Sequence, residues 1–66
     1  MSLKSQFLKL YADLPLGARS EIVGVIDNEP ITWNSARVEV ENDTAISKKI
    51  LTQLVYIGVL NENDDK

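Results

Sequence analysis

The sequence contains neither cysteine nor histidine, and these two absences exclude more chemistry than any residue that is present. Without cysteine the chain has no disulfide, no thiolate metal ligand and no thiol nucleophile. Without histidine it lacks the commonest metal ligand and the commonest general base. It also has no glycine-rich phosphate loop and no carboxylate pair spaced for acid–base catalysis. We therefore expect a non-enzymatic protein with no metal, no cofactor and no small-molecule substrate.

Long apolar runs are missing too. No stretch approaches the about 20 apolar residues that span a bilayer, and no signal peptide is visible. We therefore expect no membrane association and a cytoplasmic location. The content of 44% apolar and 26% charged residues is ordinary for a globular fold and argues against disorder.

The chain is also short, at 66 residues. A domain of this size buries only about 60% of the surface that its unfolded chain exposes, so its stability is marginal. Since disulfides are excluded, close helix packing and self-association are the remaining sources of stability. We expect a single domain over residues 1–66 that forms a homodimer.

Basic residues are in the minority, with seven against ten acidic residues and a net charge of −3. The charges are unevenly spread, because residues 21–43 hold six acids against one arginine, whereas residues 44–60 hold two lysines and no acid. Residues 61–66 form an acidic tail that we expect to fray. Overall acidity argues against strong non-specific binding of nucleic acid, and the acid-free segment is compatible with weak binding.

Apolar periodicity and capping residues predict helices near residues 3–14, 18–27, 33–40 and 44–58. The first helix begins at an N-cap, Ser2, and ends before Pro15. Asn28 is suited to the left-handed conformation that closes the second helix. The last helix ends at Gly58, where Val59 is placed to complete a Schellman cap.

The segment Pro30–Val40 fits two structures. As a helix it would be capped by Thr32. As a hairpin it would turn at Asn34-Ser35, with the alternating residues 37–41 as the second strand. We favour the helix, because a cluster of capping residues and a strongly amphipathic segment follow it.

That last segment, Thr44–Leu60, divides into two faces more cleanly than any other part of the chain. The apolar half of its helical wheel holds Ile46, Ile50, Leu51, Leu54, Val55 and Ile57. The other half holds Lys48, Lys49, Thr52, Gln53 and Tyr56, and Ser47 alone strays into the apolar half. A core face opposite a hydrogen-bonding face without carboxylates is what a nucleic-acid recognition helix requires.

The order of these elements resembles the winged-helix branch of the helix-turn-helix superfamily over the run from Ile22 to Leu60. An apolar helix (IVGVI) is followed by a turn and a hydroxyl step (NEPIT), a brief second helix (WNSARVEV), a polar turn (ENDT) and a recognition helix. The recognition helix of that branch typically ends in a leucine, three variable residues, a glycine and two apolar residues. In this chain the pattern runs from Leu54 to Leu60 and ends in Gly58-Val59-Leu60. The resemblance implies an all-α or mainly α bundle, residues 18–60, with an extra N-terminal helix. Too few residues follow Leu60 to form the β-hairpin wing, so we expect a wingless domain.

Weak binding of double-stranded DNA, with a role in transcription regulation, is the function that this pattern favours. Glutamine pairs with adenine, lysine reaches guanine or phosphate, and hydroxyl groups suit phosphates. The candidate nucleic-acid-binding residues are Ser47, Lys48, Lys49, Thr52, Gln53 and Tyr56 on the last helix, with Asn34 and Arg37 on the helix before it.

The alternative function is a protein-interaction or adaptor module that keeps the fold without binding DNA, because fold does not fix function. The polar face of the last helix would then be solvated or would contact a protein. The apolar stripe of the first helix would either pair with its copy in a dimer or pack inside its own chain. This stripe consists of Leu3, Phe7, Leu10 and Tyr11.

Overall fold

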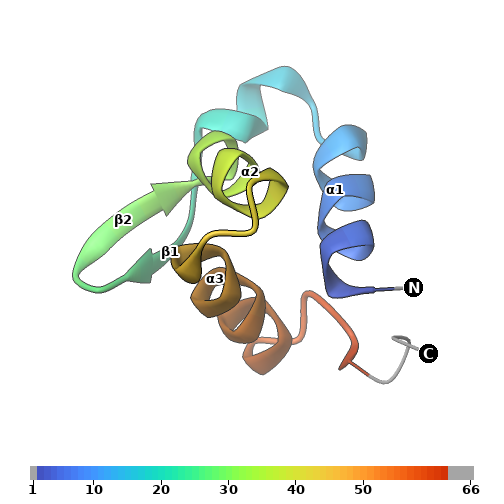
Figure 1. Ribbon diagram of the computed structural model, residues 1–66. Coiled ribbons are helices and arrows are strands. Elements are labelled where there is room, and N and C mark those ends of the chain that lie inside the picture. Colours follow the sequence, from blue (N-terminus) through green and yellow to red (C-terminus); the bar gives the residue numbers. More distant parts are fainter. Residues whose placement is uncertain (1, 63–66) are drawn as a thin grey trace.

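The computed structural model describes residues 2–62. Its elements follow the order α1 (Leu3–Asp13), a 3₁₀ helix η1 (Leu16–Ser20), β1 (Ile22–Ile26), β2 (Glu29–Thr32), α2 (Trp33–Glu41) and α3 (Ala45–Tyr56). The three α-helices gather around one core, and the antiparallel hairpin β1–β2 projects from one side (Figure 1). The fold is therefore α+β, and the prediction of an all-α bundle is wrong. The acidic tail predicted to fray lies, from residue 63 onward, outside the described residues.

Residues 18–27, predicted to form the second helix, instead form the end of η1, strand β1 and the first residue of the hairpin turn. Strand β1 is rich in β-branched residues, which favour strands, and a glycine at its centre would cost about 1 kcal/mol in a helix. Asp27 and Asn28 both have positive φ, 52° and 67°, as a two-residue type I′ turn requires. Asn28 thus takes the left-handed conformation expected of it, but it closes a hairpin instead of a helix.

The register of the hairpin explains how a proline fits inside it. The turn is closed by the pair Ile26–Glu29, and the next pair is Val25–Pro30. Hydrogen-bonded and non-hydrogen-bonded pairs alternate along an antiparallel ladder. Since the closing pair is the hydrogen-bonded one, the backbone nitrogen of Pro30 points to the outer edge of β2. Its missing N–H therefore removes no bond between the strands.

The three helices begin where the sequence predicted. The side-chain oxygens of Ser2, Thr32 and Thr44 each accept a hydrogen bond from the backbone N–H three residues later. Each cap satisfies a backbone donor that would otherwise lack a partner. The helical interpretation of Pro30–Val40 is therefore confirmed from Trp33 onward, and the hairpin alternative for that segment is wrong.

The C-terminus of α3 also follows the prediction. The N–H of Val59 donates to the carbonyl of Leu54 at 2.8 Å, and the N–H of Gly58 donates to the carbonyl of Val55 at 3.1 Å. Gly58 has a φ of 88°, the left-handed value of a Schellman cap. This turn brings Leu60 back into the core, where it is 5% exposed.

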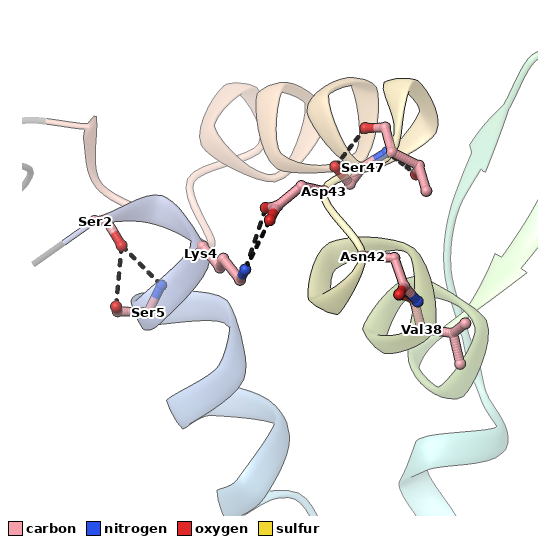
Figure 2. A network of polar contacts seen from close by, with 8 residues as sticks. Ser2, Lys4, Ser5, Val38, Asn42, Asp43 and Ser47 are labelled. Carbon is pink, nitrogen blue, oxygen red and sulfur yellow. Dashed lines mark hydrogen bonds and ion pairs between the residues drawn. The ribbon is translucent and has the colours of Figure 1, made fainter.

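All three helices and the hairpin contribute to one core. The ring of Phe7 from α1 is wholly buried and stacks on Trp33 of α2, with 5.7 Å between centroids. The other buried apolar residues are Ile26, Ala36, Val40, Ile50, Leu54 and Leu60. At the surface, Lys4 of α1 forms an ion pair of 3.0 Å with Asp43 in the turn between α2 and α3 (Figure 2). Helix α1 is thus held against the α2–α3 pair by a ring contact in the core and by an ion pair at the surface.

Within residues 2–62, no helix is both long enough and apolar enough to cross a membrane.

Candidate interaction surfaces on the last helix and the hairpin

Helices α2 and α3 are joined by a tight turn, residues 42–44. The Thr44 hydroxyl donates to the Glu39 carboxylate at 2.6 Å, and its oxygen also caps α3. This double role ties the start of α3 to the end of α2. The orientation of α3 sets which of its side chains face outward.

The polar side of α3 forms one continuous surface, which we call the α3 outer face. Its residues line a single shallow, open depression. They are Lys48, Lys49, Thr52, Gln53 and Tyr56, all predicted as nucleic-acid-binding residues. Lys48, Thr52 and Tyr56 are exposed and spaced four residues apart, so they lie along one stripe of the helix.

The other two residues of the α3 outer face are engaged by the hairpin. The Lys49 ammonium lies 2.9 Å from a carboxylate oxygen of Asp27 in the hairpin turn. The Gln53 amide packs on Gly24 so closely that a Cβ at this glycine would lie 3.1 Å from Gln53 Nε2. The hairpin therefore covers one flank of the α3 outer face and places a negative charge beside one of its two lysines.

Ser47 does not belong to this surface. Its side chain is 3% exposed, and its hydroxyl donates to the carbonyl of Thr44 at 2.6 Å. Figure 2 shows this contact within the first turn of α3. Ser47, which lies in the apolar half of the helical wheel, is thus buried in the first turn of α3.

Asn34 and Arg37 lie at the contact between α2 and α1. The Tyr11 hydroxyl donates to Asn34 Oδ1 at 2.6 Å, and the Arg37 guanidinium lies 5.3 Å from the Tyr11 ring centre. Arg37 also pairs with Glu41 at 2.7 Å. A side-chain hydrogen bond with Tyr11, followed by the charge of Glu41, raises the pKa of Arg37 above its ordinary value. The structure therefore groups these two candidates with Tyr11, and neither lines the depression on α3.

The stripe predicted as a dimer contact is used largely inside the chain. Phe7 is in the core, and Leu3 and Tyr11 pack partly buried against it. Leu10 instead lines a separate shallow groove, together with Val59 and other residues of α1 and the segment after α3. A dimer contact through this stripe stays a prediction.

A second exposed surface, which the sequence pattern did not predict, consists of Ile22, Val25 and Pro30, and we call it the hairpin outer face. Ile22 is 61% exposed and Val25 57%, although both would lie on the apolar face of the helix predicted for residues 18–27. The run of β-branched residues ahead of Asp27-Asn28 was the signal that pointed to a strand and a turn.

In the described part of the chain, no group of carboxylates is arranged to hold a metal ion. Comparison of the chain with protein-family models, with curated proteins and with solved structures finds no match. The resemblance to the winged-helix branch therefore stays a prediction. The hairpin precedes the α2–α3 pair, whereas the wing of the winged-helix branch would follow the last helix.

Proposed function

We propose that this chain is a protein-interaction domain and that the α3 outer face is its contact surface. The observation that carries the proposal is the position of Tyr56, which is 88% exposed and lines the depression on α3. Tyrosine offers a large apolar ring with a polar end, and it is enriched among the residues that dominate binding energy at protein interfaces. Lys48 and Thr52 continue the stripe and supply the polar surroundings typical of such a centre.

The charge around α3 favours a protein partner over nucleic acid. Affinity for DNA comes largely from cations that neutralise phosphates. Of the two lysines on the α3 outer face, Lys49 already pairs with Asp27. The adjacent hairpin adds Glu21 and Glu29 and no basic residue.

Photo-crosslinking distinguishes the two kinds of partner. A photoreactive amino acid at Thr52, in the depression, should give a discrete protein adduct in cells of the source organism. The change Tyr56→Ala should abolish that adduct, and it should alter stability by no more than about 0.5 kcal/mol because the side chain is exposed. The same probe at Ala12, exposed on α1, is the matched control and should give no such adduct. Adducts to nucleic acid from position 52 would contradict the proposal.

DNA binding is the second candidate, favoured by the helix-turn-helix arrangement of α2 and α3 and by the absence of carboxylates from α3. With Lys48, Lys49 and Arg37 as contacts, the logarithm of the binding constant should fall with the logarithm of salt at a slope of about −2 to −3 per chain. Changing both lysines to alanine should abolish retardation of a labelled duplex at low salt.

The Lys49–Asp27 pair supplies a sharper test of DNA binding. If α3 contacts phosphates, Asp27→Asn should tighten duplex binding, because it removes a negative charge 2.9 Å from a contacting cation. Asp13→Asn makes the same change on α1, at a residue that lines a different groove from the α3 outer face, and is the control. Equal affinities for Asp27→Asn, wild type and the double-lysine variant would count against DNA binding.

A further inference from the structure

We propose that the partner of the α3 outer face presents a single carboxylate to Lys48 and an apolar side chain to Tyr56. The inference rests on the function proposed above, because it specifies the chemistry of the segment that binds this same surface. Asp27, in the hairpin turn, is part of the proposal as an internal competitor that lowers the affinity of the surface for that segment.

The charge of α3 is opposite to that of the whole chain. The helix, Ala45–Tyr56, contains two lysines and no aspartate or glutamate, whereas the chain has a net charge of −3. Interfaces pair patches of opposite charge, so this side of the molecule suits a partner with negative charge. A DNA duplex needs several cations against its phosphates, but one lysine is enough for a single carboxylate. The number of cations therefore favours a partner with one negative side chain.

Lys48 is the lysine best placed to receive that carboxylate. Its side chain is exposed and lines the depression on α3. Within residues 2–62, no carboxylate forms an ion pair with its ammonium group, whereas Lys49 is paired with Asp27. A partner carboxylate can therefore reach Lys48 without displacing an ion pair that already exists in the protein.

Tyr56 provides the apolar part of the surface. Its side chain is 88% exposed, so a partner side chain laid against the ring removes a large apolar area from water. Positions 48 and 56 lie on the same side of the helix and about 12 Å apart along its axis, at a rise of about 1.5 Å per residue. The partner therefore carries its carboxylate and its apolar side chain at this separation, about four residues in an extended segment.

Asp27 occupies the second lysine in the way that a partner carboxylate would. The two charged groups of the Asp27–Lys49 pair are 2.9 Å apart, and both side chains are more than half exposed. Exposed ion pairs are weak, and this one keeps a negative charge beside the α3 outer face. That charge repels a partner carboxylate and holds Lys49 away from it. The hairpin turn therefore lowers the affinity of this surface for the proposed partner.

The first test uses the intact protein and a peptide of ten residues that is neutral except for one glutamate, placed four residues from a pair of leucines. Nuclear magnetic resonance titration should show amide shifts concentrated in residues 48–56. Lys48→Gln should weaken peptide binding about threefold to fivefold, the loss expected for one exposed ion pair, and Tyr56→Ala should weaken it at least as much. Lys9→Gln removes the same charge from an exposed position on α1, outside the depression, and is the matched control. It should bind the peptide as wild type does.

The second test measures the effect of the competitor. Asparagine tolerates the left-handed φ of 52° at position 27, so Asp27→Asn should leave the hairpin turn intact. The variant should bind the same peptide about threefold more tightly, because the nearby negative charge is lost and Lys49 is released. Asp13→Asn removes an equal charge from α1, at a residue that lines a different groove, and should leave the affinity unchanged.

A second peptide, with glutamine in place of glutamate, should bind about threefold to fivefold more weakly. Equal affinity of the two peptides, no binding of either, or no change in Lys48→Gln would overturn the proposal. The α3 outer face would still be a protein contact if the Tyr56-dependent adduct from position 52 forms. Duplex binding by a protein that does not bind the glutamate peptide would overturn the proposal in favour of nucleic acid. Shifts in residues 48–56 that appear with rising protein concentration and no peptide would overturn it in favour of a second copy.

Discussion

At Gly24, the missing side chain sets how closely the hairpin approaches α3. On a helical wheel of residues 18–27 this glycine would lie opposite the apolar face, where a side chain would have little to contact. In the structure it is half-buried, and the Gln53 amide fills the space that a Cβ would take. Gln53 therefore acts partly as a packing residue. Its sequence pattern could not show this, because the contact depends on a strand that the pattern assigned to a helix.

The first residue-scale prediction concerns Leu54, which is 1% exposed at the middle of the apolar side of α3. Leu54→Ala should lower the free energy of unfolding by about 2–5 kcal/mol, from lost apolar burial and the cavity left behind. Denaturant titration measures the change. Val38→Ala, at an exposed position, should stay within about 0.5 kcal/mol of wild type. A Leu54→Ala protein as stable as Val38→Ala would mean that α3 does not bury this face.

At the scale of the elements, the starts of α1, α2 and α3 follow from the sequence, whereas the strand β1 was predicted as a helix. Ser2, Thr32 and Thr44 mark helix starts by local chemistry that acts over three residues, so no knowledge of the rest of the fold was needed. The residues of β1 satisfy two periodicities at once, because Ile22, Val25 and Ile26 share a helical face while their β-branched shape suits a strand. Short apolar runs of this kind do not distinguish the two.

The residues of the candidate site also differ in whether the sequence alone could place them. The stripe Lys48, Thr52 and Tyr56 follows from helical spacing alone, and all three side chains are exposed in the structure. The engagement of Lys49 by Asp27 follows from the position of the hairpin turn, which lies far away in sequence. The exposure of Ile22 and Val25 depends on that same hairpin.

The element-scale prediction tests the hairpin through its turn. Asn28 has a φ of 67°, a conformation that asparagine and glycine tolerate and alanine does not. Asn28→Ala should therefore destabilise the protein by about 1–2 kcal/mol in denaturant titration. Asn28→Gly, the matched control, should be at least as stable as wild type, because glycine is the favoured second residue of a type I′ turn. Loss of stability in the glycine variant as well would mean that residues 27 and 28 do not form this turn.

At the scale of the whole molecule, one chain closes its own core. Phe7 from the N-terminal helix and Leu60 from beyond the last helix are both buried in it. A domain of 66 residues is expected to have only about 3–10 kcal/mol of stability. The contact between Phe7 and Trp33 is therefore a substantial part of the total, and it joins α1 to α2 without a second subunit.

This closure predicts how stability responds to protein concentration. Phe7→Leu should lower the free energy of unfolding by about 1–2 kcal/mol, from the lost ring contact and a small cavity. Since the contact is intramolecular, the drop in melting temperature should be the same at about 10 μM and about 1 mM protein, whereas a contact between subunits would make it depend on concentration. Differential scanning calorimetry of both proteins at both concentrations measures this. A drop that grows with concentration would place the stripe of α1 at a dimer interface, as one interpretation of the sequence had it. An equal drop would assign Phe7 to the core of the single chain.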